Sequence, residues 1–260
     1  MTQNSYPTLE ERLKQVLVLG RDNPDFLEYF HANHLPRHIR HIDEKCVIFS
    51  QKDDPTRSLK YVIDPYTKRK LSPLLQAIVL RGLKNHFVLQ GIPGVQVLDS
   101  PHFYNSIPGL LGPFGYLEGF NLAHPNPSFL EDPKHILYLF QEQLDAETLS
   151  HIHAQKMVHR DVKPGNIIYS GERLWLIDWS ITGNFTEVLQ DFQARRPLGT
   201  FGYMNSGLEC SRDYFALGVS LAQTLCPDLV LQEPLYTDEY RDQAKKALRR
   251  RFGEEFEEYF

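Results

Sequence analysis

Residues 159–166 read HRDVKPGN, and residues 177–180 read IDWS. Between these two segments, residues 166–170 and 173–178 are short stretches rich in β-branched and aromatic residues, separated by a Ser-Gly-Glu turn. This pattern predicts a β-hairpin. A hairpin would bring the polar residues at the end of the first segment beside those at the start of the second.

The polar residues of these two segments meet the needs of phosphoryl transfer. A carboxylate must orient the attacking hydroxyl and accept its proton, oxygen ligands must hold magnesium on the phosphates, and positive charge must offset the developing negative charge. Asp161 can meet the first need and Lys163 the third. Asn166 and Asp178 offer two hard oxygen ligands from neighbouring backbone segments.

The first segment resembles the catalytic loop of eukaryotic-type protein kinases, H-R-D-x-K-P-x-N, and Asp178 stands where their metal-binding D-F-G aspartate belongs. Residues 199–204, GTFGYM, resemble the end of the activation loop in serine/threonine kinases. The resemblance implies that Thr200 faces Asp161 and Lys163. Residues 213–219, DYFALGV, resemble a buried helix start whose aspartate braces the catalytic loop.

This resemblance implies an α+β, bilobal fold with a small antiparallel β N-lobe and a mainly helical C-lobe. It also implies a serine/threonine protein kinase that uses ATP and Mg²⁺ and acts on a protein substrate. Asp161, Lys163 and Thr200 would be catalytic, and Asn166 and Asp178 would hold the metal and nucleotide. Lys163 favours serine/threonine specificity, because tyrosine kinases usually carry arginine or alanine near that place.

The periodicity of the chain predicts elements that suit this architecture. Short strands are expected at 38–42, 45–50, 58–63, 94–99 and 109–117, and a loop at 121–133. Helices are expected from Thr8, from Asn23 through Phe30, and over 72–84, 134–156, 213–225 and 238–259. We therefore expect an N-terminal helical extension over 1–37, a kinase N-lobe over 38–120 and a shortened C-lobe over 121–260.

The N-terminal half resembles kinases less closely. Lys60 stands in a strand similar to the one whose lysine contacts the ATP phosphates, and Glu118 in a segment similar to the hinge that receives adenine, with Phe114 as gatekeeper. Residues 42–46, IDEKC, contain no glycine where the phosphate loop is expected, and carboxylates there would repel phosphate. Ala77 stands where the glutamate partner of the lysine is expected, next to Gln76.

Two other functions compete with this interpretation. A small-molecule phosphotransferase of the aminoglycoside or choline kinase type shares the fold, and its Ile-Asp-Trp metal motif resembles residues 177–179. Arg160, Lys163 and the Gly-Thr pair at 199–200 favour a protein substrate instead. A pseudokinase scaffold would explain the missing glycine loop and the missing glutamate partner. Four residues oppose that interpretation: Asp161, Lys163, Asn166 and Asp178.

The composition is that of an ordinary globular protein, with 42% hydrophobic and 23% charged residues. A formal net charge of −5 does not favour nucleic acid as a partner. The three cysteines lie far apart, which favours reduced thiols and a cytoplasmic location, and no stretch is apolar enough for a membrane span. Nothing in the pattern indicates an oligomeric state.

Overall fold

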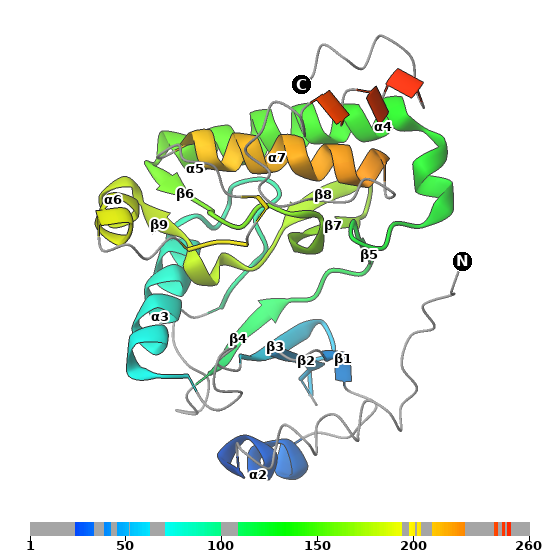
Figure 1. Ribbon diagram of the computed structural model, residues 1–260. Helices are drawn as coiled ribbons and strands as arrows, with labels where there is room; N and C mark the ends of the chain where they lie inside the picture. The colour runs from blue at the N-terminus through cyan, green and yellow to red at the C-terminus, as the bar shows by residue number, and fades with distance from the viewer. Residues whose placement is uncertain are drawn as a thin grey trace. The chain divides into compact units, whose positions relative to one another are not determined.

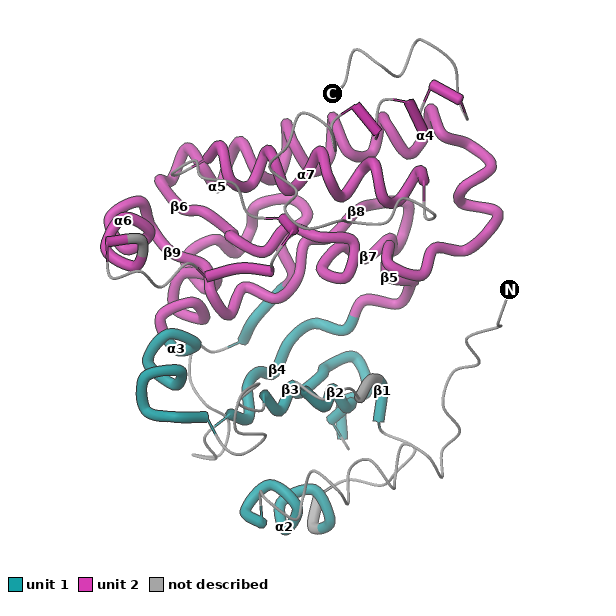
Figure 2. The backbone as a smooth tube through the Cα atoms, in the orientation of Figure 1, with its two compact units in different colours: residues 1–80, 97–116 teal, residues 81–96, 117–260 magenta. Residues whose placement is uncertain are grey.

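The computed structural model describes residues 24–33, 39–42, 46–51, 53–62, 71–99, 109–193, 198–200, 202–203, 210–226, 242–243, 246–247 and 249–250. The chain forms two compact units (Figure 2). Residues 1–80 and 97–116 belong to the first unit, and residues 81–96 and 117–260 to the second. Helix α3 (Pro73–Val88) begins in the first unit and ends in the second.

The first unit contains an antiparallel sheet of four strands in the order β1-β2-β3-β4 (Figure 1). The strands are β1 (Ile39–Ile42), β2 (Cys46–Ser50), β3 (Arg57–Val62) and β4 (Leu110–Gly115). Residues alternate between the two faces of a strand. Leu59 and Tyr61 of β3 are buried, whereas Lys60 between them is half-buried and pairs with Ile48 of β2. Lys60 therefore lies on the opposite face of the sheet from its two neighbours.

Helix α2 (Pro24–Asn33) packs on the buried face of this sheet. Its Phe26 ring stacks on Tyr61 with 3.9 Å between ring centroids, and its Phe30 meets Phe49 edge to face. Aromatic pairs in these geometries add to the stabilisation that their buried area supplies. Burial raises the pKa of Tyr61 to about 12, so this hydroxyl stays neutral.

The second unit combines a long helical run with two small sheets (Figure 1). Asp132 caps the start of α4 (Pro133–Tyr138) by accepting from the His135 amide at 2.9 Å. The run continues through the π-helix η4 (Leu139–Leu149) into α5 (Ser150–Ala154), and α7 (Cys210–Leu225) contacts both α4 and η4. Strands β5 (Phe120–Asn121), β7 (Ile167–Ser170) and β8 (Arg173–Leu176) form one antiparallel sheet, and β6 (Met157–Val158) and β9 (Gly183–Asn184) form the other.

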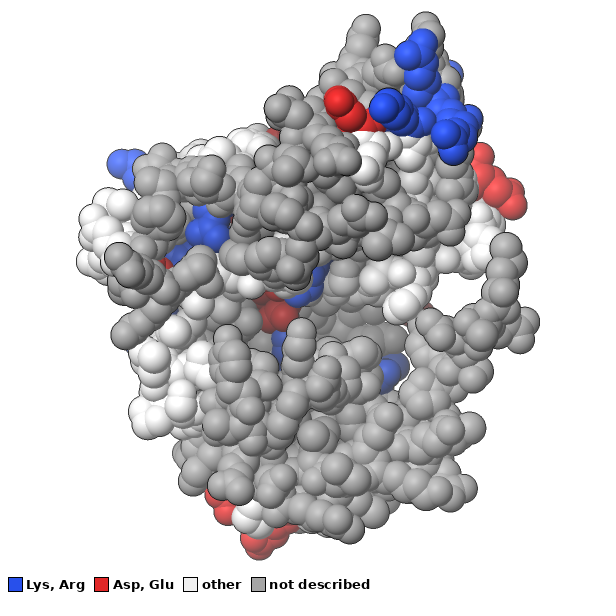
Figure 3. Space-filling model, in the orientation of Figure 1, with Lys and Arg blue, Asp and Glu red and all other residues white. Residues whose placement is uncertain are grey.

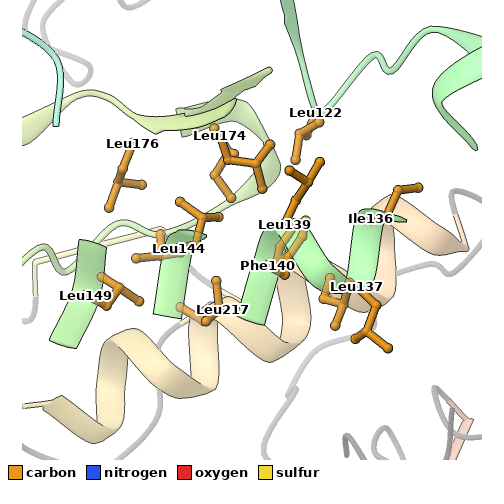
Figure 4. Close-up of a cluster of buried hydrophobic side chains, with 14 of the residues drawn as sticks. Leu122, Ile136, Leu137, Leu139, Phe140, Leu144, Leu149, Leu174, Leu176 and Leu217 are labelled. Carbon is orange, nitrogen blue, oxygen red and sulfur yellow. The ribbon is translucent and has the colours of Figure 1, made fainter. Parts of the chain in front are cut away.

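The core of this unit lies between the helical run, α7 and the β7–β8 hairpin (Figure 4). Leu144 and Leu149 of η4, Leu174 and Leu176 of β8, and Leu217 of α7 belong to this cluster. Both ends of the hairpin are thus anchored by apolar side chains. This anchoring fixes the backbone that leads into the two segments with polar residues.

Three short 3₁₀ helices and one further α-helix complete the described part of this unit. The short helices are η3 (Pro127–Glu131), η5 (Pro164–Asn166) and η6 (Trp179–Ile181). Helix α6 (Phe185–Gln193) begins with a capping box. Asn184 Oδ1 accepts from the Glu187 amide at 3.0 Å, and Glu187 Oε2 accepts from the Asn184 amide at 2.8 Å.

The predicted α+β fold, with a small antiparallel β unit and a mainly helical unit, is confirmed. The predicted strand over 94–99 is wrong, because Val95 and Leu98 form only isolated bridges, to Leu176 in the second unit and Phe114 in the first. The predicted loop at 121–133 contains the helix η3, and α6, β6 and β9 were not predicted. The helix expected from Thr8 and most of the helix expected over 238–259 lie outside the described residues. The domain limits stay a prediction. Within the described residues, no helix has the length and apolar character to cross a membrane.

Candidate functional site

A buried carboxylate binds the backbone of the segment 159–166. Asp213, on the first turn of α7, is fully buried and accepts from the backbone amides of His159 and Arg160, each at 2.8 Å. His153 Nε2 lies 3.0 Å from the same carboxylate. Arg160 has a φ of +75°, which is unusual for a residue with a side chain. The two bonds to Asp213 hold the backbone in this conformation next to Asp161.

The Asp161 carboxylate receives hydrogen bonds from three side chains. Lys163 Nζ donates to Oδ2 at 2.7 Å, Thr200 Oγ1 donates to Oδ1 at 2.6 Å, and Asn166 Nδ2 donates to Oδ2 at 2.8 Å. The Thr200 amide adds a bond of 3.0 Å to Oδ1. Lys163 Nζ also lies 2.6 Å from Thr200 Oγ1, which closes a ring of contacts. The structure thus brings together four predicted site residues from two separate segments.

Asp178 follows the hairpin at the turn into η6. It adopts a left-handed conformation, with φ and ψ both 63°, and its Oδ1 accepts from the Ser180 hydroxyl at 2.9 Å. The hairpin connects it to the catalytic segment, since the Ile177 amide donates to the Asn166 carbonyl at 2.9 Å. His159 Nε2 lies 3.0 Å from the Ile177 carbonyl. The residue before Asp178 is therefore bonded to both ends of segment 159–166.

Trp179, next to Asp178, is buried between two histidines. Its ring stacks on His86 with 5.3 Å between ring centroids and meets His159 edge to face at 4.5 Å. Burial lowers the pKa of His86 to about 4 and also lowers the pKa of His159. Both rings are neutral at physiological pH. An aromatic side chain that is packed in this way anchors the backbone beside Asp178.

Asn166 and Asp178 suit a magnesium ion by the type of their donor atoms. The Asn166 amide nitrogen donates to the Asp161 carbonyl and carboxylate, both at 2.8 Å, so its carbonyl oxygen is the atom left for a cation. Asp178 adds carboxylate oxygens. Mg²⁺ prefers such hard ligands and takes few of them from the protein. Among the residues that the structure describes, no cluster of three or more His, Cys, Asp or Glu side chains could hold a metal.

The other two residues that were predicted to bind nucleotide, Lys60 and Glu118, do not belong to the segments around Asp161. Lys60 is in β3 of the first unit. Gln76, on α3 of the same unit, donates its side-chain amide to the Leu71 carbonyl at 2.8 Å. Glu118 is exposed in the second unit, and its backbone carbonyl accepts from Ser170 Oγ at 2.6 Å. Gly119 allows this approach, because a Cβ there would collide with the Tyr169 carbonyl.

The site also involves a residue that the sequence did not single out. Asp191 of α6 accepts from Arg160 Nη1 at 2.7 Å. The capping box at Asn184 and Glu187 was the available signal for α6, because an Asn followed three residues later by Glu is typical of a helix start. The contact itself joins residues 31 positions apart. No local pattern predicts such a pairing.

A comparison with known protein families finds a match over the part of the chain that contains these residues. Residues 136–258 match the family model described as the protein kinase domain. Over this part of its length the chain is similar to protein kinases. The matched segment contains Lys163, Asn166 and Thr200, the described residues whose side chains donate to Asp161. The match supports phosphoryl transfer in general, an activity for which this family uses ATP and Mg²⁺. No curated protein matches the chain.

Proposed function

We propose that this protein is a protein kinase that transfers the γ-phosphoryl group of ATP to a serine or threonine hydroxyl of a protein substrate. The observation that carries the proposal is the environment of Asp161. Lys163, Thr200 and Asn166 donate to its carboxylate from three directions, at 2.6 to 2.8 Å. These donors fix the orientation of the carboxylate, which is the first requirement of a base that accepts a proton from a positioned hydroxyl.

Lys163 and Thr200 have complementary roles in this proposal. Lys163 is one-quarter exposed and lies 2.7 Å from Asp161, so its ammonium can offset negative charge that develops on the transferred group. The Thr200 hydroxyl connects the base and this ammonium at 2.6 Å from each. The presence of Lys163 and of the Gly-Thr pair at 199–200 supports serine or threonine, rather than tyrosine, as acceptor.

The proposal assigns metal and nucleotide binding to four residues. Asn166 and Asp178 would hold Mg²⁺, which when bound neutralises charge on the phosphates. Lys60 would contact the ATP phosphates, and the backbone at Glu118 would receive adenine, as the resemblance of these segments implies. We also propose the domain limits 1–37, 38–120 and 121–260 and a cytoplasmic location, which the small number and wide spacing of the cysteines favour.

A phosphate-transfer assay tests the function. The full chain is incubated with radiolabelled ATP and Mg²⁺, with a mixture of proteins or with small hydroxylated and amino-sugar acceptors. We expect labelled phosphoserine or phosphothreonine that needs both Mg²⁺ and the intact chain. Asp178→Ala should abolish the magnesium-dependent signal, because Mg²⁺ has few protein ligands and binds much more weakly when one of them is lost.

The same assay separates the alternatives. Label in a small acceptor alone would identify a small-molecule phosphotransferase. No label in any acceptor, from protein that still binds ATP, would identify a scaffold. Unchanged magnesium dependence in Asp178→Ala would move the metal to another site.

A further inference from the structure

Two arginines converge on one carboxylate oxygen beside the catalytic segment. Asp191 Oδ2 accepts from Arg160 Nη1 and from Arg81 Nη2, each at 2.7 Å. The three residues come from different parts of the second unit: segment 159–166, helix α6 and the second half of α3. Charge-assisted bonds of this length are among the strongest that side chains form.

Arg160 depends on this partner because its guanidinium is buried. The side chain is 1% exposed, and within the described residues Asp191 is the carboxylate that forms an ion pair with it. Its Nε and Nη2 form no hydrogen bond with any residue that the structure describes. Gly183 lies against the guanidinium, where a Cβ would collide with it. A buried charge is costly unless it is paired, so the loss of Asp191 would leave Arg160 uncompensated next to Arg81.

Helix α6 holds Asp191 in place through further contacts. Glu187, one turn earlier on α6, accepts from Asn85 Nδ2 at 3.1 Å and lies 3.9 Å from Arg81 Nε. Both partners belong to the second half of α3. The capping box at Asn184 fixes the start of the helix. Asp191 is thus attached to a helix that is anchored at two points.

We propose that Asp191 is a positioning residue for phosphoryl transfer, acting on Asp161 through Arg160. Asp213 holds Arg160 by its backbone amide, and Asp191 holds it by its side chain. The left-handed backbone of Arg160 is strained, and such conformations persist only when the surroundings enforce them. Release of the side chain shifts the backbone of the next residue, Asp161. The inference rests on the proposed kinase activity.

Chemical rescue tests the role of Asp191. Asp191→Ala should lower kcat by about a hundredfold with little change in the KM for ATP, because a displacement of about 1 Å at the reacting groups costs on that order. Formate can occupy the place of the lost carboxylate between the two guanidiniums. We expect it to restore kcat by about tenfold. Potassium chloride at the same ionic strength should not.

Two further variants complete the series. Asp191→Glu keeps the charge and should retain most of the activity, whereas Asp191→Asn keeps the shape and should lose most of it. The matched control is Glu147→Ala, which breaks the surface pair between Glu147 and Arg173 at 2.8 Å and should behave as wild type. Wild-type kcat in Asp191→Ala, or a loss that formate does not reverse, would overturn the proposal.

Hydrogen exchange gives a readout that does not need activity. The amides of His159 and Arg160 should exchange at least tenfold faster in Asp191→Ala, and formate should restore their protection. Glu147→Ala should leave these rates unchanged. If the wild type transfers no phosphate, the kinase proposal fails, while this experiment still decides whether Asp191 positions the loop. Equal exchange in wild type and Asp191→Ala would refute the positioning role.

Discussion

The segment around Asp161 and the strand that carries Lys60 place their polar groups by different means. Asp161 is oriented by donors from Lys163, Asn166 and Thr200, all within hydrogen-bonding distance. Lys60 is placed by strand alternation, which puts it on the face opposite Leu59 and Tyr61. Alternation decides the face on which a side chain lies, but it does not decide its partner. A contiguous motif with mutual contacts therefore identifies chemistry more strongly than a position in a strand.

The largest expected effect is that of Asp161→Asn. An amide cannot accept the proton of the attacking hydroxyl, so kcat should fall by about 10²- to 10⁴-fold, the usual contribution of general acid–base catalysis. The affinity for ATP should change little, because the base acts in the transition state. Single-turnover phosphate transfer and nucleotide titration measure the two quantities. Glu142→Gln, an exposed position on η4, is the control. A mutant with wild-type turnover would remove Asp161 from the mechanism.

Asp213→Ala tests whether the C-terminal region depends on its buried contacts. The change leaves the buried amides of His159 and Arg160 without their acceptor, and it removes the partner of His153. We expect the free energy of unfolding to fall by about 3–5 kcal/mol. Both tryptophans, Trp175 and Trp179, lie in the second unit, so urea unfolding followed by tryptophan fluorescence reports on it.

Glu142→Ala provides the matched control for that measurement, because its carboxylate is exposed. It should change the free energy of unfolding by no more than about 0.5 kcal/mol. A loss below about 1 kcal/mol in Asp213→Ala would mean that solvent or a neighbouring group replaces the carboxylate, and that the catalytic segment is held mainly by its side chains.

A pH titration examines the histidines packed on Trp179. The pKa of His86 is about 4 in the folded chain and 6.5 in the unfolded chain. Protonation therefore favours the unfolded chain, and the stability present above pH 6.5 is lost as the pH falls toward 4. The loss from this residue amounts to about 3 kcal/mol. The pKa of His159 is lowered in the same direction and adds to it.

His86→Phe isolates the contribution of His86. Phenylalanine can keep the ring contact with Trp179 but does not titrate, so its unfolding free energy should depend less on pH between 6.5 and 4. Urea unfolding across this range, again by tryptophan fluorescence, gives the difference between the two proteins. Parallel curves for wild type and His86→Phe would show that the His86 ring is solvated in the folded chain.

The contacts among the predicted site residues follow from the sequence pattern more directly than the contact of Asp191 does, while the roles of these residues stay a prediction. Asp161, Lys163 and Asn166 are close in the chain, and a short hairpin brings Asp178 near, so local pattern was sufficient. The strand predicted over 94–99 was wrong because its pattern of apolar residues serves two separate bridges, at Val95 and Leu98. The pairing of Asp191 with Arg160 could not be predicted, because it depends on how α6 lies against distant residues. Local periodicity carries no information about such long-range pairing.

The basic residues near residue 250 also show that a local pattern does not identify a binding partner. Figure 3 shows Lys and Arg atoms gathered at the upper right, in the region where Figure 1 draws residues 242–250. Lys246, Arg249 and Arg250 are exposed there, and Ala247 packs against the core of the second unit. Their spacing indicates a helix with one solvated face, and a charge run of this kind identifies no partner by itself.

Lys60→Met should give the smallest effect of these changes. It tests whether the strand position of Lys60 identifies a residue that contacts the ATP phosphates. If Lys60 contacts the ATP phosphates, its loss removes a charge-assisted hydrogen bond worth roughly 1.5–3 kcal/mol, so ATP should bind about tenfold to a hundredfold more weakly. The fold should remain intact, because Lys60 is half-buried on the face opposite the core formed with α2 and methionine can keep its apolar contacts. Isothermal titration with ATP and Mg²⁺ measures the affinity, and circular dichroism monitors the fold.

Lys84→Met, an exposed position on α3, is the matched control and should bind ATP as wild type does. Normal binding and turnover in Lys60→Met would show that resemblance in a single strand was insufficient to identify the phosphate contact. Lys45 and Lys52, which lie outside the described residues, would then be the next positions to change.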